Sequence, residues 1–441
     1  MSISILVAFF ALLGSFLVVR STADTSFLKL FIGFIVFPPC VALVQQPLIA
    51  PEHCLMFVAL LSCLLWDKDD FIASLGAFPL KIPLFILAMS FASAGMQMNE
   101  STGYCLYIAA RSFIDTVAVI VLTYHFGRFA DMDTVKRIFL KFLIVCGIFC
   151  TIEYLLKYNV VYKAICLSFP YYSGIFSLKD IASSSEGWRP RVFFTTVHAN
   201  TFGAILDCVF WLYAPDVLNR TGQERKKALI PCIIIMYLVL LTGSATALGC
   251  IVVTVGLFLF RRMRPTGKLL VIALALCIGT AVVVKVVNHF SAAREGSNIS
   301  LRESQLLFTL VEIQEHPWLG YGYHYIGDVI FERDSSGDLI DSSLPAEIGM
   351  LESVLFSWWI ERGLQFLIVF FGYMVMLGFY FERHKTRPPA VSGQYIIYAI
   401  SLFLLLSGEM GGNTYMAFSL IGLCLGATDA DILDADEEAA S

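Results

Sequence analysis

Long apolar runs recur along this chain, and they limit the folds open to it more than any other feature of the sequence. Each run has about 16–23 residues, and a helix needs about 20 residues to cross the apolar core of a bilayer. We therefore expect about 12 or 13 crossings. The runs lie at 3–19, 28–48, 52–66, 72–95, 104–126, 138–156, 196–214, 229–242, 245–260, 268–287, 363–381, 392–408 and 412–427.

The composition fits the same class. Of the 441 residues, 58% are hydrophobic and only 15% are charged, whereas the exterior of a water-soluble protein needs far more charged surface. The expected fold class is all-α: a polytopic integral membrane protein whose residues 1–441 form a single membrane domain. Residues 3–19 follow no basic stretch and precede no small-residue cleavage site, so they are expected to form a membrane helix rather than a signal peptide.

Basic residues between the runs indicate the orientation. The loops 215–228, 261–268 and 382–388 are rich in Arg and Lys, and they fall on one side if each intervening run crosses once. Positive charge marks the cytoplasmic side. The segments 157–194 and 288–362 then lie outside, which is the periplasm in a bacterium with two membranes. The orientation of the N-terminus stays open between an odd and an even number of crossings.

Neither charge nor cysteine content points to another class of protein. No Lys/Arg-rich stretch with interleaved aromatic residues is present, so no nucleic-acid partner is expected. The 12 cysteines form no CxxC pair, which argues against a disulfide framework or a zinc site. The net charge of −5 comes largely from the tail 428–441, expected to be a solvated cytoplasmic end. Its acids are Asp429, Asp431, Asp434, Asp436, Glu437 and Glu438.

Candidate site residues on the outer side begin before the run at 196–214. Arg189 and Arg191 precede His198 and Asn200 in the stretch Trp188-Arg189-Pro190-Arg191 to Asn200. The arginines could bind a substrate phosphate or simply anchor the chain to lipid phosphates. His198 could simply cap the helix that follows.

The expected periplasmic loop 288–350 carries a second group of candidates. From Arg302 to Glu315 the apolar residues recur with helical spacing, and Pro317 ends the pattern, which predicts an amphipathic helix at the outer interface. The sequence His316-Pro317-Trp318-Leu319-Gly320-Tyr321-Gly322 follows, and its glycines Gly320 and Gly322 are typical of a turn.

Three charged features lie inside apolar stretches. Glu352 falls between Met350 and Ile360, where an unpaired carboxylate costs several kcal/mol, so it is a candidate functional acid unless an arginine pairs with it. Arg111 and Asp115 are spaced i,i+4 and are expected to form a structural pair. Asp207 is a single acid within a run and could serve a proton path.

In this order, these motifs resemble those of the O-antigen ligase and oligosaccharide-repeat-unit polymerase superfamily of bacterial envelopes. The resemblance covers residues 185–380. It rests on Arg302, on the "hPxLGxG" turn at 316–322, on Glu361-Arg362-Gly363, and on Arg191, Phe193, His198 and Asn200. The stretch LLTGSATAL at 240–248 is similar to the family's "lTgSRtal" hairpin, with Ala245 where many members have arginine. Glu352-Ser353 stands where ligases usually show His-Asn, which favours the polymerase branch.

The resemblance implies a GT-C-like inverting glycosyltransferase of the inner (cytoplasmic) membrane that needs no metal or other cofactor. Its donor would be an oligosaccharide linked to undecaprenyl pyrophosphate. Arg302 and Arg191, with Arg189 as a weaker candidate, would hold the pyrophosphate, since arginine matches phosphate oxygens bidentately. Glu352, or His316 in competition, would accept the acceptor's proton. Other partners implied are membrane lipid and either a chain-length regulator or an export complex.

Four readings compete with a polymerase of exopolysaccharide, capsule or O-antigen. A ligase of the same superfamily would share the donor. A transporter would have internal repeats and midplane charges; no clear repeat is visible, but Pro38-Pro39 and the Arg111/Asp115 pair are compatible with it. A flippase for the lipid-linked oligosaccharide would lack the catalytic carboxylate. A purely structural scaffold gives no reason for the charged outer loop.

Overall fold

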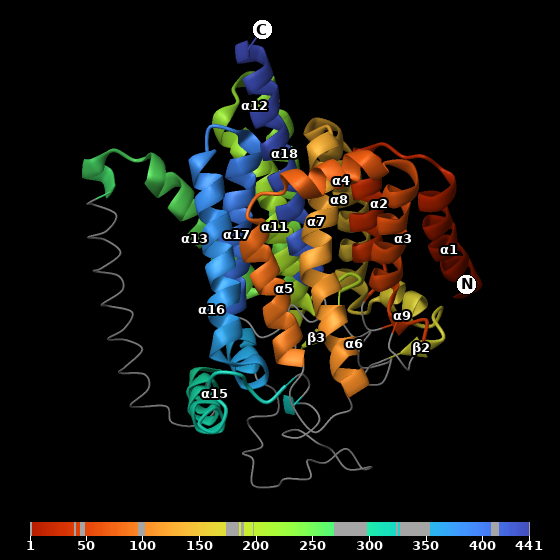
Figure 1. The fold of residues 1–441 in the computed structure, drawn as a ribbon, viewed down its shortest axis with the longest axis vertical. Coiled ribbons are helices and arrows are strands. Elements are labelled where there is room, and N and C mark those ends of the chain that lie inside the picture. Colours follow the sequence, from red (N-terminus) through yellow and green to blue (C-terminus); the bar gives the residue numbers. More distant parts are fainter. Residues whose placement is uncertain are drawn as a thin grey trace.

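The computed structural model describes residues 2–38, 41–44, 49–95, 102–172, 185–186, 189–196, 198–268, 298–322, 325–326, 353–406 and 414–440. Within these ranges the chain is a bundle of helices with two small two-stranded ladders, β1 with β2 and β3 with β4 (Figure 1). The elements are α1 (Ser2–Val18), α2 (Ala23–Val36), β1 (Val41–Ala42), α3 (Pro51–Trp66), α4 (Lys68–Ala77), α5 (Lys81–Gly95), α6 (Thr102–Phe113), the π-helical turn η1 (Ile114–Ala118), α7 (Val119–Phe129), α8 (Met132–Leu156), α9 (Val160–Cys166), β2 (Tyr171–Tyr172), β3 (Ser185–Glu186), β4 (Arg189–Pro190), α11 (Ala199–Asn219), α12 (Gly222–Thr242), α13 (Ala245–Arg262), α15 (Asn298–Glu312), α16 (Val354–Arg383), α17 (Pro388–Leu406) and α18 (Thr414–Ala440).

The predicted class is confirmed: the chain is an all-α polytopic membrane protein. Seven helices of the described part are long and apolar enough to cross a membrane, or eight if the bent pair α4 and α5 is one span. The seven lie at Ala109–Phe129, Met132–Leu156, Ala199–Asn219, Ala245–Arg262, Val354–Arg383, Pro388–Leu406 and Thr414–Leu433. Helices α1 and α3 are apolar but shorter, and the run predicted at 268–287 lies outside the described residues.

The centre of the bundle is built on α7, α11 and α18. Glycines let α7 and α18 approach closely: a Cβ added at Gly422 would overlap Ile120 and Thr123, and one at Gly426 would overlap the backbone of Tyr124. The spacing of Gly422 and Gly426 is that of the small-residue contacts that pack helices in membranes.

The basic loops lie together at one end of the bundle, as the predicted orientation requires. Lys136, near the start of α8, pairs with Asp216 at 2.6 Å, and Arg220 reaches the same carboxylate at 3.3 Å. Arg261, at the end of α13, pairs with Glu382 at 2.7 Å. We call this the basic end, and the positive-inside rule predicts that it faces the cytoplasm. The opposite end, with α9, β2 and α15, is called the outer end (Figure 1).

The structure also bears on the orientation of the N-terminus. Phe9 of α1 packs against Phe169, just after α9, whereas Arg20 beyond the other end of α1 pairs with Asp67 at 3.4 Å. Helix α1 therefore runs from the outer end toward the basic end, where the C-terminus also lies (Figure 1). Termini at opposite ends require an odd number of passes, which favours about 13 over 12.

One predicted crossing was wrong in shape. The run at 72–95 is divided between α4 and α5, which meet at 96°. The cause is Pro79, because the residue before a proline avoids the helical conformation. Phe78 accordingly has φ −50° and ψ 122°, and Leu80 has a φ of 56°.

Two other runs end differently from the expectation. In the run at 28–48, α2 ends at Val36, just before the two prolines. At the C-terminus, the acids of the tail continue helix α18 to Ala440. Asp429 accepts a hydrogen bond from the Tyr124 hydroxyl at 2.6 Å and lies 3.5 Å from Arg128. The first acid of the tail therefore belongs to the packed bundle.

Candidate functional site

Arg191 lies at the outer end, where the segment after β4 crosses the turn between α12 and α13. The amide of Val192 donates to the carbonyl of Leu241 at 3.2 Å, which places the segment beside that turn. Gly243 adopts a φ of 61°, and a Cβ added there would lie 3.5 Å from Cγ of Arg191. The LLTGSATAL stretch thus forms the surface on which the stem of Arg191 rests.

The first turn of α11 holds the other end of the Arg191 side chain. Nη2 of Arg191 donates to Oδ1 of Asn200 at 2.8 Å. The amide of Asn200 donates to Nδ1 of His198 at 3.2 Å, so His198 caps the helix. The structure therefore brings Arg191, His198 and Asn200 together. A half-buried guanidinium at a helix N-terminus joins two features that attract anions.

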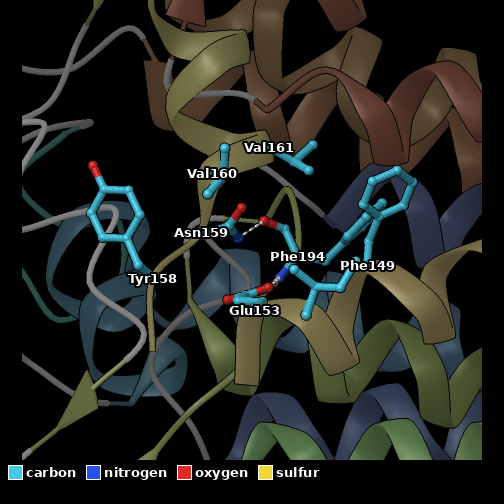
Figure 2. A pocket seen from close by; sticks show the side chains of 8 residues that line it. Phe149, Glu153, Tyr158, Asn159, Val160, Val161 and Phe194 are labelled. Atoms are coloured by element: carbon cyan, nitrogen blue, oxygen red, sulfur yellow. Dashed lines mark hydrogen bonds between the residues drawn. The ribbon is translucent and has the colours of Figure 1, made fainter. Parts of the chain in front are cut away.

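A buried acid that the sequence reasoning missed supports this segment. Glu153, near the end of α8, is 4% exposed, and its two carboxylate oxygens accept from the amides of Phe193 and Phe194, each at 3.1 Å. Figure 2 shows the bond to Phe194. Asn159 caps α9 and donates its side-chain amide to the carbonyl of Phe194. Phe194 has a φ of 52°, a conformation that costs about 1–3 kcal/mol unless its surroundings hold it. The sequence signal that could have identified Glu153 is its position as an acid inside the apolar run 138–156.

The two motifs at 316–322 and 361–363 dock on each other. Helix α16 has a non-helical break at Gly363, with φ 74° and ψ 172°. Backbone amides on both sides of the contact donate across it: Tyr321 to Ile360 at 2.8 Å, Gly322 to Glu361 at 2.7 Å, Leu364 to Pro317 at 3.0 Å and Gln365 to Trp318 at 3.2 Å.

Glycine is required at this contact by space as well as by conformation. A Cβ added at Gly363 would overlap the backbone of Trp318 and Leu319, and one at Gly320 would overlap Glu361. Gly320 and Gly322 have φ of 71° and 105°. These glycines therefore fix the start of the long membrane helix α16 to the outer loop.

His316 lies exposed at the edge of this contact. Its ring meets the ring of Tyr321 edge-on at 4.8 Å, and Tyr321 stacks on Tyr325 at 4.2 Å. The hydroxyl of Tyr325 donates to Glu312 at 3.0 Å. Burial, followed by this hydrogen bond, raises the pKa of Tyr325, so its hydroxyl stays a proton donor at neutral pH.

The remaining predicted site residues are located in less detail. Arg302 belongs to α15, which spans Asn298–Glu312 where a helix from Arg302 to Glu315 was expected. Arg189 lies in β4, opposite Glu186 of β3. Glu352 lies outside the described residues. The structure thus links Arg191 through Asn200 to His198, at the start of α11. It also places His316 beside Gly320, whose amide donates to the carbonyl of His316 at 3.0 Å.

Arg362 is a second cation that the sequence reasoning did not single out as a site residue. Its guanidinium lies over the rings of Trp358, Phe366 and Phe91, at 4.8, 4.9 and 5.6 Å. Phe91 belongs to α5, so the arginine links the outer parts of α5 and α16. Aromatic faces stabilise a cation in a partly dry environment.

The charges within the helices form a separate group. Arg111 and Asp115 lie 3.8 Å apart, and His53 of α3 lies 3.5 Å from Asp115, at the π-helical turn. The buried carboxylates of Glu52 and Asp207 have no hydrogen-bond partner among the described residues. Within the described ranges, no three His, Cys, Asp or Glu side chains are placed to hold a metal ion. Metal independence stays a prediction.

The fold defines a multi-pass membrane protein. At its outer end, Arg191 is bound by Asn200, and Arg362 lies against aromatic rings. Residues 230–371 match the model of a protein family described as O-antigen ligase. The match supports the O-antigen ligase and polymerase superfamily for residues 230–371, and a glycan-processing function of that type. The match spans the turn at Gly243, α15 and the docked motifs at 316–322 and 361–363. No curated protein matches the chain.

Proposed function

We propose that the protein polymerises lipid-linked oligosaccharide repeat units into a cell-surface or exported polysaccharide at the outer face of the bacterial inner membrane. The observation that carries the proposal is Arg191, half-buried and bound to Asn200 in the first turn of α11 at the outer end. A membrane-embedded pyrophosphate needs such a cation, because its charge cannot be solvated by lipid. The match over residues 230–371 supports the same substrate class.

The proposed reaction displaces a lipid pyrophosphate at the anomeric carbon. The acceptor hydroxyl attacks C1 of the donor sugar, the C1–O bond to the pyrophosphate breaks with its electron pair, and the anomeric centre inverts. Arg191 and Arg302, with Arg189 as the weaker candidate, neutralise the leaving pyrophosphate. The proton of the acceptor passes to Glu352, with His316 as the alternative base.

A ligase that transfers finished polymer to another lipid is the second candidate. The matching family model is itself described as a ligase, which favours this reading. Glu352-Ser353, in place of the His-Asn pair of ligases, favours the polymerase. The two differ in what accumulates when the gene is absent: single repeat units for a polymerase, and long polymer on its lipid carrier for a ligase.

The test is polymer laddering in a deletion strain that carries the wild type or single variants. We expect wild type to restore long chains, and Arg191→Ala, Arg302→Ala and Glu352→Gln to leave single repeat units at wild-type protein levels. Arg191→Lys should also fail, because a point charge cannot replace the guanidinium fork.

The matched control is Arg225→Ala, an exposed arginine at the basic end, which should restore full-length polymer. Long chains with the outer variants would disprove the site assignment. Normal polymer without the gene would disprove the function and favour a transporter or flippase.

A further inference from the structure

Helix α15 exposes its apolar face. Leu306 is 39% exposed, Leu307 58%, Leu310 41% and Val311 65%, whereas Gln305 and Thr309 on the other face are fully buried. A helix in contact with water buries its apolar face and exposes its polar face. The reason is that full burial of an aliphatic side chain stabilises the fold by about 1.5–3 kcal/mol. The exposed face therefore requires an apolar environment.

The other face of α15 is fixed to the outer end of α16. Ile313 and Phe308 pack in a small cluster with Tyr321 and Ile360. Figure 1 shows α15 almost end-on while α16 runs lengthwise, so the axis of α15 crosses that of the membrane helix. A helix placed across a membrane-spanning helix at its end lies along the membrane surface.

The exposed face continues the lipid-facing surface of the bundle. Helix α16 exposes Ile368, Val375 and Phe379 along its length, at 57%, 56% and 65%. Next to α15, the docked turn exposes Trp318 at 61% and Leu319 at 47%. Tryptophan prefers the boundary between headgroups and acyl chains.

We propose that the apolar face of α15, made of Leu306, Leu307, Leu310 and Val311 together with Trp318, is embedded in the outer-leaflet boundary between phospholipid headgroups and acyl chains. None of these side chains carries a charge, and amphipathic interfacial helices bury such a face about 5–10 Å into that boundary. The occupant is phospholipid because the face is continuous with the lipid-facing side of α16. The inference goes beyond the proposed function, since it holds for a polymerase and a ligase alike.

The test uses the full-length protein in vesicles of phosphatidylglycerol and phosphatidylcholine, with bromine atoms near the carbonyl end of the acyl chains. Trp318 is the fluorescent reporter. Its component of the emission is the wild-type spectrum minus the spectrum of Trp318→Phe. We expect the bromines to quench this component and aqueous iodide to leave it unchanged.

The double variant Leu307→Asp, Val311→Asp should lose the bromine quenching and gain iodide quenching, because two charges oppose insertion. The control Gln314→Asp, at an exposed polar position beside α15, should behave as wild type. Quenching of the wild-type component by iodide alone would overturn the proposal. Protection from both quenchers would also overturn it, since another protein segment would then cover the face. If the double variant does not fold, the bromine and iodide quenching of the wild-type Trp318 emission still tests the proposal.

Discussion

Glu153 is the residue whose replacement tests the support of the Arg191 segment most sharply. Both of its oxygens accept backbone amides, whereas glutamine offers one acceptor and turns an N–H toward the other amide. A buried amide without a partner costs about 1–3 kcal/mol. We expect Glu153→Gln to lower the thermal unfolding midpoint in detergent and to shorten the polymer.

The matched control is Tyr154→Phe, next in sequence and 39% exposed, which should change neither property. An unchanged ladder and an unchanged midpoint in Glu153→Gln would contradict the supporting role. Rescue by Glu153→Asp is not expected, because the shorter side chain cannot reach both amides.

At this scale the sequence predicted only part of the candidate site. Arg191, His198 and Asn200 were found by their order before an apolar run, and the structure brings them together. Glu153 and Asn159 were missed because they lie about 35–40 residues before Phe193 and Phe194 in the sequence. Their role depends on the turn at Phe194. A positive φ at phenylalanine has no local signature in the sequence.

At the scale of elements, the break in α16 gives the clearest prediction. Gly363→Ala places a Cβ against the backbone of Trp318 and adds the strain of a positive φ, which alone costs about 1–3 kcal/mol. We expect a lower unfolding midpoint and loss of polymer. Gly372→Ala in the same helix is the control: its Cβ meets nothing within 4 Å, and alanine favours a helix by up to about 1 kcal/mol. Equal stability of the two variants would contradict the docking of the two motifs.

The apolar runs located the helices well, and their errors have local causes. The run at 72–95 did not reveal the 96° bend, although Pro79 marked it. The docking of 316–322 on 360–365 could not be predicted from spacing, because the partners are about 40 residues apart and join through backbone atoms. Sequence patterns indicate which residues form helices, but not which loops meet.

For the whole molecule, the contacts at the basic end predict the orientation. We expect alkaline phosphatase to be active when fused after residue 335 and inactive after residue 266 or 386, because the enzyme matures only outside the cytoplasm. A tag at the N-terminus should be open to protease in spheroplasts, and a C-terminal tag should be protected. Protection of the N-terminal tag would contradict the odd number of passes.

We propose that the outer end of the protein joins repeat units and releases lipid pyrophosphate. The most direct measurement mixes the purified protein in vesicles with lipid-linked repeat units and follows product length and released undecaprenyl pyrophosphate together. We predict products that lengthen by one repeat unit for each pyrophosphate released, and neither product nor release with Arg191→Ala. The polymerase function would be contradicted if the wild type moved the lipid-linked units across the bilayer without lengthening them, or released pyrophosphate without forming new glycosidic bonds.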